Sequence, residues 1–319
     1  MINIKGTTWV EKYRPTTLSQ VSSQKNVINS LKNVIYKKNI PHLIFFGPSG
    51  CGKTSTILAL AKDIFKEEFD TRTIELNASD ERGISVIRQK IKLYAKLSVN
   101  SKNKSIPKWK LIILDEADSM TSESQCALRR IMEEYSYITR FCIICNYHNK
   151  IIDPIVSRCS LFRFKPIEKD IISNKLIQIS KLENVNIDEN DINKIIQISR
   201  GDLRKAINFL QKYSSLHHTI NLDELAGFIS YNRLQKWINY CILKKDKKIK
   251  KNINIFFNEG YSLVNQIIIL KNLIISNNIL DDNKKCNIII KLMEIDQNLI
   301  KGCDEYIQFL NFGYYIANS

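Results

Sequence analysis

A glycine-rich segment in the first third of the chain has the residue types and spacing of a phosphate-binding loop. It reads Gly47-Pro-Ser-Gly-Cys-Gly-Lys-Thr54 and matches G-x-x-x-x-G-K-[ST] at every fixed position. Its glycines let backbone N–H groups turn toward phosphates, Lys53 would reach the β- and γ-phosphates, and Thr54 would ligate Mg²⁺. An apolar run at 43–46 precedes the segment and a helical pattern at 54–65 follows it. This context favours phosphate binding over a glycine-rich turn that binds nothing.

Two adjacent carboxylates follow a second apolar run, in Lys110-Leu-Ile-Ile-Leu-Asp-Glu-Ala-Asp118. At the end of a strand, Asp115 could hold the Mg²⁺ shell, and Glu116 could polarise an attacking water. An acidic helix cap is the alternative. We favour the cap for Asp118, with Ser119 beginning the next helix. The phosphate-binding loop favours the catalytic interpretation of Asp115 and Glu116. An ATPase needs this pair, whereas a nucleotide kinase does not.

Three further polar residues stand at positions where they could serve a nucleotide. Asn146 ends an apolar run, where a parallel sheet delivers side chains to its ligand crevice, although a turn residue is the alternative. Arg158 lies in a short polar segment and by default is a surface residue. Arg204 lies in the first turn of a predicted helix that Asp202 can cap. Because a cation is unfavourable at that end of a helix, its position weakly indicates a role beyond stability.

Cys142 and Cys145 form a C-x-x-C pair within the apolar run 141–145. In isolation the pair would suggest zinc or redox chemistry. No second pair with finger spacing accompanies it, so we expect buried core thiols. The eight cysteines are dispersed, which indicates reduced thiols in an intracellular protein.

The elements that must position these residues alternate between strand and helix. Four short apolar runs, at 43–46, 73–76, 111–114 and 141–145, alternate with helical patterns at 54–65, 83–97 and 122–135. This alternation predicts a doubly wound parallel sheet. The polar stretch 98–108 is predicted to be a surface loop. After Pro166 only helical patterns remain. We expect three domains: 1–166 for nucleotide binding, 167–229 as a small helical domain and 230–319 as a second helical domain.

Charge indicates a polyanionic partner. The chain has 319 residues and a net charge of +16, and residues 1–166 hold 27 basic against 15 acidic side chains. Nucleic acid is the first candidate and an anionic membrane the second, with a solubility charge as the alternative. The expected helix at 83–97 carries Arg88, Lys92 and Lys96 at four-residue spacing, which could meet a phosphate backbone or be a solvated face. Six lysines within 244–251 could be a nuclear localisation signal, but a solvated helix is favoured. No apolar run approaches the length of a membrane span, so we expect no membrane.

The motifs together resemble those of a known family. The loop at 47–54, Leu114-Asp-Glu-Ala-Asp118, Asn146, Ser157-Arg-Cys159 and Gly201-Asp-Leu-Arg204 occur in the order and spacing of AAA+ ATPases. Trp9-Val-Glu-Lys-Tyr-Arg-Pro15, Glu75-Leu-Asn-Ala-Ser-Asp-Glu-Arg-Gly83 and Ser119-Met-Thr-Ser122 resemble the small subunits of replication factor C, the eukaryotic sliding-clamp loader. The resemblance is dense over residues 9–211 and weak from Asn221 onward.

The resemblance implies an AAA+ α/β P-loop ATPase domain, a small all-helical lid and an all-helical collar that joins five subunits. It implies ATP and Mg²⁺ as cofactors and, as partners, the other replication factor C subunits, the sliding clamp PCNA and primer–template DNA, in the nucleus. One rival is another AAA+ DNA-remodelling ATPase, such as a branch-migration helicase, which would carry a winged-helix tail. The other is a non-hydrolysing AAA+ scaffold, which should lack Glu116 or Lys53.

The resemblance also implies residue roles. Glu116 would be catalytic, Asn146 the first sensor, Arg204 the second sensor from the lid, and Arg158 an arginine finger acting in trans on a neighbour's ATP. Thr54 and Asp115 would hold the metal, and Arg82, Arg88, Lys92 and Ser122 would contact DNA. The ATP-binding set comprises Val10, Tyr13, Arg14, Pro15, Val21, Gly47, Pro48, Ser49, Gly50, Cys51, Gly52, Lys53, Thr54, Ser55, Asn146 and Arg204, and the first five of these would line the adenine pocket.

Overall fold

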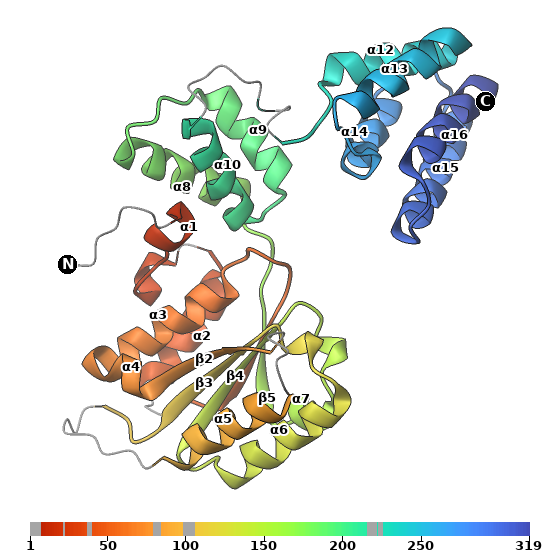
Figure 1. Ribbon diagram of the computed structural model, residues 1–319. Coiled ribbons are helices and arrows are strands. Elements are labelled where there is room, and N and C mark those ends of the chain that lie inside the picture. Colours follow the sequence, from red (N-terminus) through yellow and green to blue (C-terminus); the bar gives the residue numbers. More distant parts are fainter. Residues whose placement is uncertain are drawn as a thin grey trace. The chain divides into compact units, whose positions relative to one another are not determined.

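The computed structural model describes residues 8–21, 23–36, 40–78, 84–97, 106–215, 222 and 226–319. The chain divides into two compact units, Met1–Gln211 and Lys212–Ser319, hereafter the N-terminal and C-terminal units (Figure 1). Each unit has its own apolar core, and each is described by itself.

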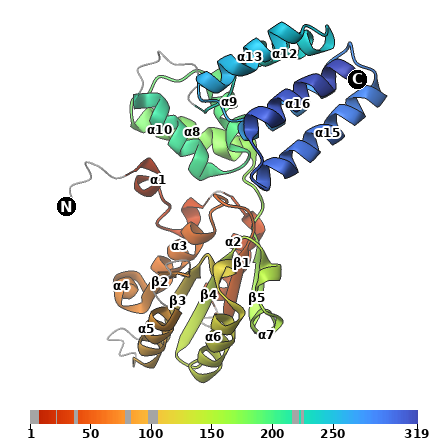
Figure 2. The same ribbon diagram turned by 45° about the vertical axis from the view of Figure 1, so that its right-hand side comes forward.

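The N-terminal unit contains a five-stranded parallel sheet in the order β2-β3-β4-β1-β5 (Figure 2). The strands are β1 (His42–Phe46), β2 (Thr73–Asn77), β3 (Lys110–Asp115), β4 (Thr139–Cys145) and β5 (Cys159–Arg163). The four predicted strands are confirmed. The sequence interpretation missed β5, because at the edge of the sheet none of its residues is fully buried, and Cys-Ser-Leu-Phe-Arg is no continuous apolar run.

Helices cover both faces of this sheet, as the strand–helix alternation predicts (Figure 1). Side chains of α2 (Lys25–Tyr36) and α3 (Lys53–Phe65) pack on one face. Those of α5 (Ile84–Lys96), α6 (Ser122–Glu134) and α7 (Asp153–Val156) pack on the other. The shorter elements are α1 (Trp9–Lys12), η1 (Leu18–Gln20), η2 (Lys66–Glu68), α4 (Phe69–Arg72), η3 (Ala117–Ser119) and η4 (His148–Lys150).

The sheet also settles the interpretation of the cysteine pair. Cys142 belongs to the core on the α3 face, whereas Cys145 belongs to the core on the α6 face. Residues three apart on a strand point to opposite faces, so the two thiols cannot share a metal ion. Both are buried, as predicted, and burial raises the pKa of the Cys145 thiol to about 12.

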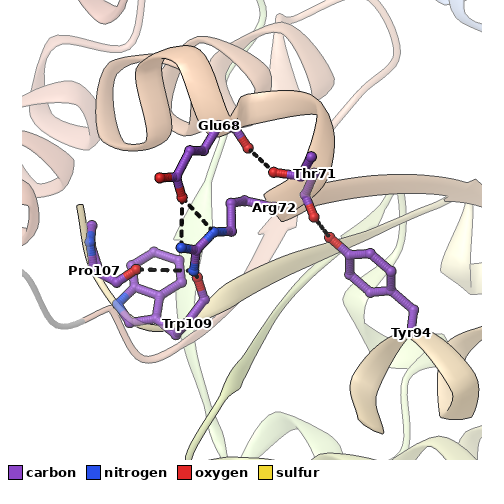
Figure 3. Close-up of polar contacts among 6 residues, drawn as sticks. All are labelled: Glu68, Thr71, Arg72, Tyr94, Pro107 and Trp109. Atoms are coloured by element: carbon purple, nitrogen blue, oxygen red, sulfur yellow. Dashed lines mark hydrogen bonds and ion pairs between the residues drawn. The ribbon is translucent and has the colours of Figure 1, made fainter. Parts of the chain in front are cut away.

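Polar contacts of Arg72, Tyr94 and Lys110 hold α4 and α5 beside the sheet, and Figure 3 shows those of Arg72 and Tyr94. Arg72 forms a two-pronged ion pair with Glu68, with N···O distances of 2.6 and 2.9 Å, and also donates to the carbonyls of Pro107 and Trp109. The Tyr94 hydroxyl donates to the Thr71 carbonyl at 3.1 Å. From β3, the Lys110 ammonium donates to the carbonyls of Tyr94 and Leu97 at the end of α5, where a cation also suits the helix dipole. The position of α5 against the sheet is therefore fixed by hydrogen bonds as well as by packing.

Three helices follow the sheet: α8 (Lys169–Leu182), α9 (Glu189–Ser199) and α10 (Leu203–Ser215), of which all but the last four residues of α10 belong to the N-terminal unit. Each turns an apolar stripe inward, and the stripes meet through fully or almost fully buried side chains. These include Ile172, Leu176, Ile179, Ile195 and Leu210.

The C-terminal unit is helical throughout its described part, as predicted. It contains α12 (Tyr231–Ile242), α13 (Asp246–Asn258), α14 (Leu263–Ile275), α15 (Asp282–Ile300) and α16 (Glu305–Asn318). Trp237 lies at its centre, edge-on to Phe309 with ring centroids 4.9 Å apart. Across the described residues of both units, no helix combines the length and apolar character needed to cross a membrane.

Candidate active site

A cavity of about 360 Å³ lies in the N-terminal unit, where the carboxyl ends of the central strands meet the three helices that follow the sheet. Parallel sheets hold ligands at this edge. Of the predicted ATP-binding and catalytic residues it is lined by Val10, Tyr13, Arg14, Pro15, Val21, Ser49, Gly50, Gly52, Lys53, Thr54, Ser55, Asp115, Glu116, Asn146 and Arg204. Gly47, Pro48 and Cys51 do not line it. They belong to the body of the loop, where the Cys51 side chain is fully buried.

The loop needs glycine at positions 47, 50 and 52. A Cβ on Gly47, where φ is +146°, would lie 2.2 Å from the Phe164 carbonyl oxygen. Gly52 has φ +92° and is the N-cap of α3, whose free N–H groups form an anion-binding end. Gly50 has φ +64°, and a Cβ there would lie 1.7 Å from Oδ1 of Asp202. The Leu203 N–H donates to the Gly50 carbonyl at 3.2 Å. The loop is thus joined directly to the start of α10.

Lys53 is held beneath the loop with 8% of its surface exposed. Its ammonium donates to the carbonyls of Gly47 and Pro48 at 2.7 and 2.8 Å and to Oδ1 of Asn146 at 3.0 Å. These three acceptors hold a cation at the cavity wall, and no carboxylate in the described part of the chain forms an ion pair with it. The charge therefore remains available to a phosphate.

Thr54 and Asp115 provide an oxygen pair that fits Mg²⁺. The Thr54 hydroxyl donates to Oδ2 of Asp115 at 2.7 Å, although 61 residues separate them. Hydroxyl and carboxylate oxygens are ligands that Mg²⁺ accepts alongside phosphate oxygens. Both residues line the cavity.

Glu116 follows Asp115 with an unusual backbone. Its φ is +53°, in the left-handed region, and its N–H donates to Oδ1 of Asp115 at 2.9 Å. Such a conformation costs of order 1 kcal/mol for a residue other than glycine and clusters at functional sites. The turn leaves the Glu116 carboxylate exposed and facing the cavity instead of continuing the strand.

The prediction that Asp118 caps the next helix is wrong. Asp118 lies in η3, lines the cavity, and its Oδ2 accepts the Asn146 N–H at 3.4 Å. The residue that caps α6 is Thr121, whose hydroxyl accepts the Ser124 N–H. Because η3 lies between β3 and α6, the helix begins four residues later than Asp118.

The helix α10 begins as predicted, with Asp202 as its cap. Oδ1 of Asp202 accepts the Lys205 N–H at 3.0 Å, and Oδ2 accepts the Ser49 hydroxyl at 3.3 Å. One carboxylate therefore caps the helix and holds the phosphate-binding loop. In the first turn of this helix, Arg204 is exposed and lines the cavity.

The N-terminal segment is tied across the cavity to these same helices. The Tyr13 hydroxyl and the Lys12 ammonium both donate to Oε1 of Glu183, each at 2.6 Å. The Trp9 N–H donates to the side chain of Gln211 on α10 at 3.0 Å. The hydrogen bonds from Lys12 and Tyr13 lower the pKa of Glu183. We call Trp9, Lys12 and Tyr13 with these two partners the N-terminal strap.

Arg158 is absent from the cavity lining. Its guanidinium pairs with the Glu133 carboxylate at 2.7 Å and donates to the Pro154 carbonyl at 2.7 Å. About two fifths of the side chain remains exposed. An arginine at this position does not line the chain's own cavity.

The predicted DNA contacts are only partly within the described residues. Arg82 and the side chain of Arg88 lie outside them. Lys92 is exposed on α5, and Ser122 is exposed as the first residue of α6. Also on α6, buried Gln125 donates to the carbonyls of Met120 and Lys150 and accepts the Ile152 N–H. It joins the start of α6 to the segment that comes after Asn146.

Sequence reasoning missed several lining residues. Asn77 ends β2 in register with Asp115, and the signal that identified Asn146, a polar residue at a strand end, could have found it. Lys175 lines the cavity from α8, and burial lowers its pKa. The apolar lining residues Ile167, Ile171, Leu203 and Ile207 share the pattern of any amphipathic helix, so no local signal marks them.

Comparison with protein families assigns most of the chain. Residues 43–167 match the family of ATPases associated with various cellular activities. Residues 174–214 match the AAA+ ATPase lid domain of the RCF1/5-like type, and residues 230–313 match the replication factor C C-terminal domain.

Relatives that match over nearly their whole length belong to the same family. Replication factor C subunit 2 of Schizosaccharomyces pombe is 44% identical, over 96% of this chain and 93% of the relative. Human replication factor C subunit 4 is 43% identical, over 95% of this chain and 86% of the relative. The replication factor C small subunit of Archaeoglobus fulgidus is 40% identical, over 97% of each chain. Among solved structures, the Thermotoga maritima RuvB branch-migration motor is similar in fold, with a TM-score of 0.53, 17% identity and coverage of 72% of this chain and 79% of that one.

Proposed function

The chain belongs to the replication factor C small-subunit family, and we propose that its ATP hydrolysis drives the loading of a sliding clamp onto primer–template DNA. It is an AAA+ ATP hydrolase of the clamp-loader class. The observation that carries the proposal is the convergence of Lys53, the Thr54–Asp115 pair, Glu116 and Asn146 on one cavity.

Each residue has a role in hydrolysis that its contacts support. Lys53 would exchange loop carbonyls for β- and γ-phosphate oxygens, while the N–H groups at the start of α3 hold the phosphate chain. Thr54 and Asp115 would hold Mg²⁺, which neutralises phosphate charge when bound. Glu116 would accept a hydrogen bond from the attacking water. Asn146 would contact the γ-phosphate, so that binding or loss of this phosphate would shift the segment after Asn146.

The helices α8 to α10 would form the lid of this site. Arg204 would approach the γ-phosphate from α10, because Asp202 joins that helix to the phosphate-binding loop. Val10, Tyr13, Arg14, Pro15 and Val21 would surround the adenine. We assign residues 1–166 to the ATPase domain, 167–229 to the lid and 230–319 to the collar.

A neighbouring subunit would complete the reaction. Arg158 would act in trans on the neighbour's ATP, an assignment supported by its place outside its own cavity. An arginine finger is worth about 10³–10⁵ in rate. In the free chain the Glu133 carboxylate holds this guanidinium, and an exposed ion pair of this kind is worth about 1 kcal/mol or less. The pair can therefore yield to a phosphate.

Assembly into a heteropentamer is supported by an exposed stripe on α15. Ile288, Leu292 and Ile295 face the core of the C-terminal unit, yet the opposite side of the helix is not uniformly polar. Cys286, Ile290, Met293, Gln297 and Ile300 recur at spacings of four, three, four and three and are all exposed. This is the spacing of a helix–helix seam. We propose that unlike subunits cover it.

Duplex DNA would lie along α5 and α6, where Arg82, Arg88, Lys92 and Ser122 would contact phosphates. The net charge of +16 supports this. The Gln125 bonds offer a route from α6 to the segment after Asn146. The assembled ring would open the clamp, PCNA, and clamp loading would take place in the nucleus.

The two rivals are less well supported. A branch-migration ATPase shares the fold, but residues 230–313 match the replication factor C C-terminal domain instead of a winged helix. A non-hydrolysing scaffold should lack Lys53 or Glu116, and both line the cavity.

Reconstitution tests the proposal. The chain is co-expressed with candidate partner subunits, and clamp loading onto a primed template is followed by fluorescence. We expect ATP-dependent loading that needs this chain, and ATPase activity stimulated by clamp and primer–template together. An assembly that hydrolyses ATP but loads no clamp, with any partner set, would overturn the clamp-loading assignment.

A further inference from the structure

The strongest positive charge in the C-terminal unit is concentrated where α12 ends and α13 begins. Six lysines stand within eight residues there, and all are exposed: Lys244, Lys245, Lys247, Lys248, Lys250 and Lys251. Asp246 is the one acidic residue among them. We call these six lysines the basic corner. Figures 1 and 2 show α12 and α13 side by side at this end of the unit.

The rest of the unit is balanced in charge. Residues 212–319 hold 14 basic and 10 acidic side chains, and segment 244–251 supplies six of the basic ones and one of the acidic ones. Without that segment the unit would be slightly acidic. Elsewhere among the described residues of the unit, cations with carboxylate partners include Arg233 with Glu259, Lys285 with Asp282 and Lys291 with Glu294. None of the six lysines of the basic corner pairs with a carboxylate of the described chain.

Stability does not account for this arrangement. Lys244 has φ +52°, a left-handed conformation unfavourable for a residue with a Cβ. Lys247 and Lys248 lie in the first turn of α13, where the helix dipole repels cations, and Lys245 at the N-cap makes no side-chain capping bond. Of these four lysines, Lys248 alone has a compensating contact among the described residues, a cation–π contact with Tyr240, so the arrangement points to a functional requirement.

The basic corner is also rigid. Ile249 and Ile253 of α13 are fully buried in the core of the unit, and Phe256 lies one turn farther on. The Lys248 ammonium lies 5.0 Å from the centroid of the Tyr240 ring. A partner that reads lysines in an extended peptide would have to pull Ile249 out of the core. The fold therefore favours a partner that recognises a folded cationic surface over a receptor for nuclear localisation signals.

We propose that the basic corner binds the phosphate backbone of a DNA duplex, at a site separate from the DNA-facing helices α5 and α6. Four lysines within residues 247–251 give about one positive charge per 2 Å of helix axis, at ~1.5 Å per residue. Each strand of a duplex presents one phosphate charge per about 3.4 Å of helix axis. The basic corner therefore carries enough positive charge to neutralise the phosphates of the strand that it faces. The site adds a function to a unit that otherwise would serve to join subunits, and its assignment to DNA rests on the proposed function.

The test compares two triple variants of the full chain in the reconstituted loader. One replaces Lys247, Lys248 and Lys251 of the basic corner with Gln, and the matched control replaces Lys271, Lys284 and Lys301, which are exposed in the same unit. Glutamine keeps helix propensity while removing charge. Unchanged helical circular dichroism and ATP affinity establish that both variants fold, and co-purification with the partner subunits establishes that they assemble. Binding of a blunt duplex without a primer junction is followed by fluorescence anisotropy across a salt series.

We expect the basic-corner variant to bind the duplex about tenfold or more weakly. The slope of the logarithm of its binding constant against the logarithm of salt concentration should become about two to three units less steep. The control should change affinity less than twofold. Equal affinities and slopes in the two variants would overturn the proposal. Duplex binding at the control level, with selective loss of binding to phosphatidylserine vesicles or of nuclear accumulation, would overturn it in favour of a membrane or an import receptor. If duplex binding is lost as expected in a loader that loads no clamp, the basic corner stands and the proposed clamp-loading function fails.

Discussion

The Lys53 ammonium donates a hydrogen bond to Oδ1 of Asn146 at 3.0 Å, across 93 residues of chain. The two residues meet because β1 and β4 are parallel neighbours, with Phe46 in register with Cys145. The segments after these two strands therefore emerge at the same edge of the sheet. A γ-phosphate bound to Lys53, as we propose, would compete with this hydrogen bond and so would affect the segment after β4 directly.

Replacing Lys53 with Ala should abolish ATP binding at this subunit's own site. The change removes the one ammonium held at the cavity wall by the loop carbonyls, and we expect affinity to fall at least a hundredfold. Fluorescent-nucleotide titration measures it. Lys62→Ala, an exposed change on the same helix, is the matched control and should bind normally. Normal nucleotide affinity in the Lys53 variant would contradict the assignment of residues 47–54 as a phosphate-binding loop.

Glu116→Gln should bind ATP with near-normal affinity and hydrolyse it about a hundredfold more slowly. The amide keeps the size of the side chain but cannot polarise water as a carboxylate does. Single-turnover hydrolysis with the other sites of the assembly disabled measures the effect. Glu123→Gln, on an exposed position of α6, should leave the rate unaltered. An undiminished rate in the Glu116 variant would refute the catalytic role.

Arg158→Ala should impair a neighbour's site, whereas Arg204→Ala should impair the subunit's own site. Arg158 stands outside the cavity and Arg204 lines it. We expect Arg158→Ala to slow hydrolysis at the adjacent site at least a hundredfold and to leave this subunit's own ATP binding intact. Assemblies with individually disabled sites show which one loses activity. Glu133→Gln releases Arg158 without removing it and should not slow either site. A defect confined to the subunit's own site in Arg158→Ala would exclude action in trans.

Glu183→Gln should weaken ATP binding three- to tenfold through the N-terminal strap, with little change in the maximal hydrolysis rate. Glu183 and Lys12 do not line the cavity, whereas Tyr13 does, so the strap would act on ATP binding through the positions of Tyr13 and the lid. Tyr13→Phe removes one of the two 2.6 Å hydrogen bonds and should give part of the same loss. The double variant should lose less than the sum of the two. Additive losses would show that the two side chains act independently.

His42 should make folding sensitive to mildly acidic pH. Burial, with a smaller effect of the nearby Arg140 cation, lowers the pKa of His42 to about 4, and its Nδ1 accepts the Phe141 N–H. Between pH 6.5 and 4 the unfolded chain takes up a proton here that the folded chain refuses, so stability falls as pH falls. The loss is on the order of 2 kcal/mol by pH 4, allowing for partial exposure. Urea unfolding of the wild type and of His42→Asn at several pH values checks this. Parallel pH profiles for the two proteins would exclude His42 as the cause.

The sequence by itself predicted which polar residues gather at the cavity. The loop at 47–54, the Asp115-Glu116 pair and Asn146 were all identified, because each stands at a junction between a strand and the next element. Strand ends converge in any parallel sheet, so the site can be inferred from the alternation of elements without knowledge of the packing. Strands β1, β3 and β4 were predictable because their buried apolar runs are continuous.

Tertiary structure alone decided which further residues line the cavity and which distant segments meet around it. Lys175 and Ile207 reach the cavity from amphipathic helices whose patterns mark only an apolar face. The hydrogen bond between Tyr13 and Glu183 spans 170 residues of chain. The ion pair between Arg158 and Glu133 joins two surface charges whose partners cannot be read from the sequence. Contacts between distant segments depend on how the elements pack, and packing leaves no periodic signal in the chain. The interpretation of Asp118 failed for this reason, because only the fold brings its carboxylate to the backbone of Asn146.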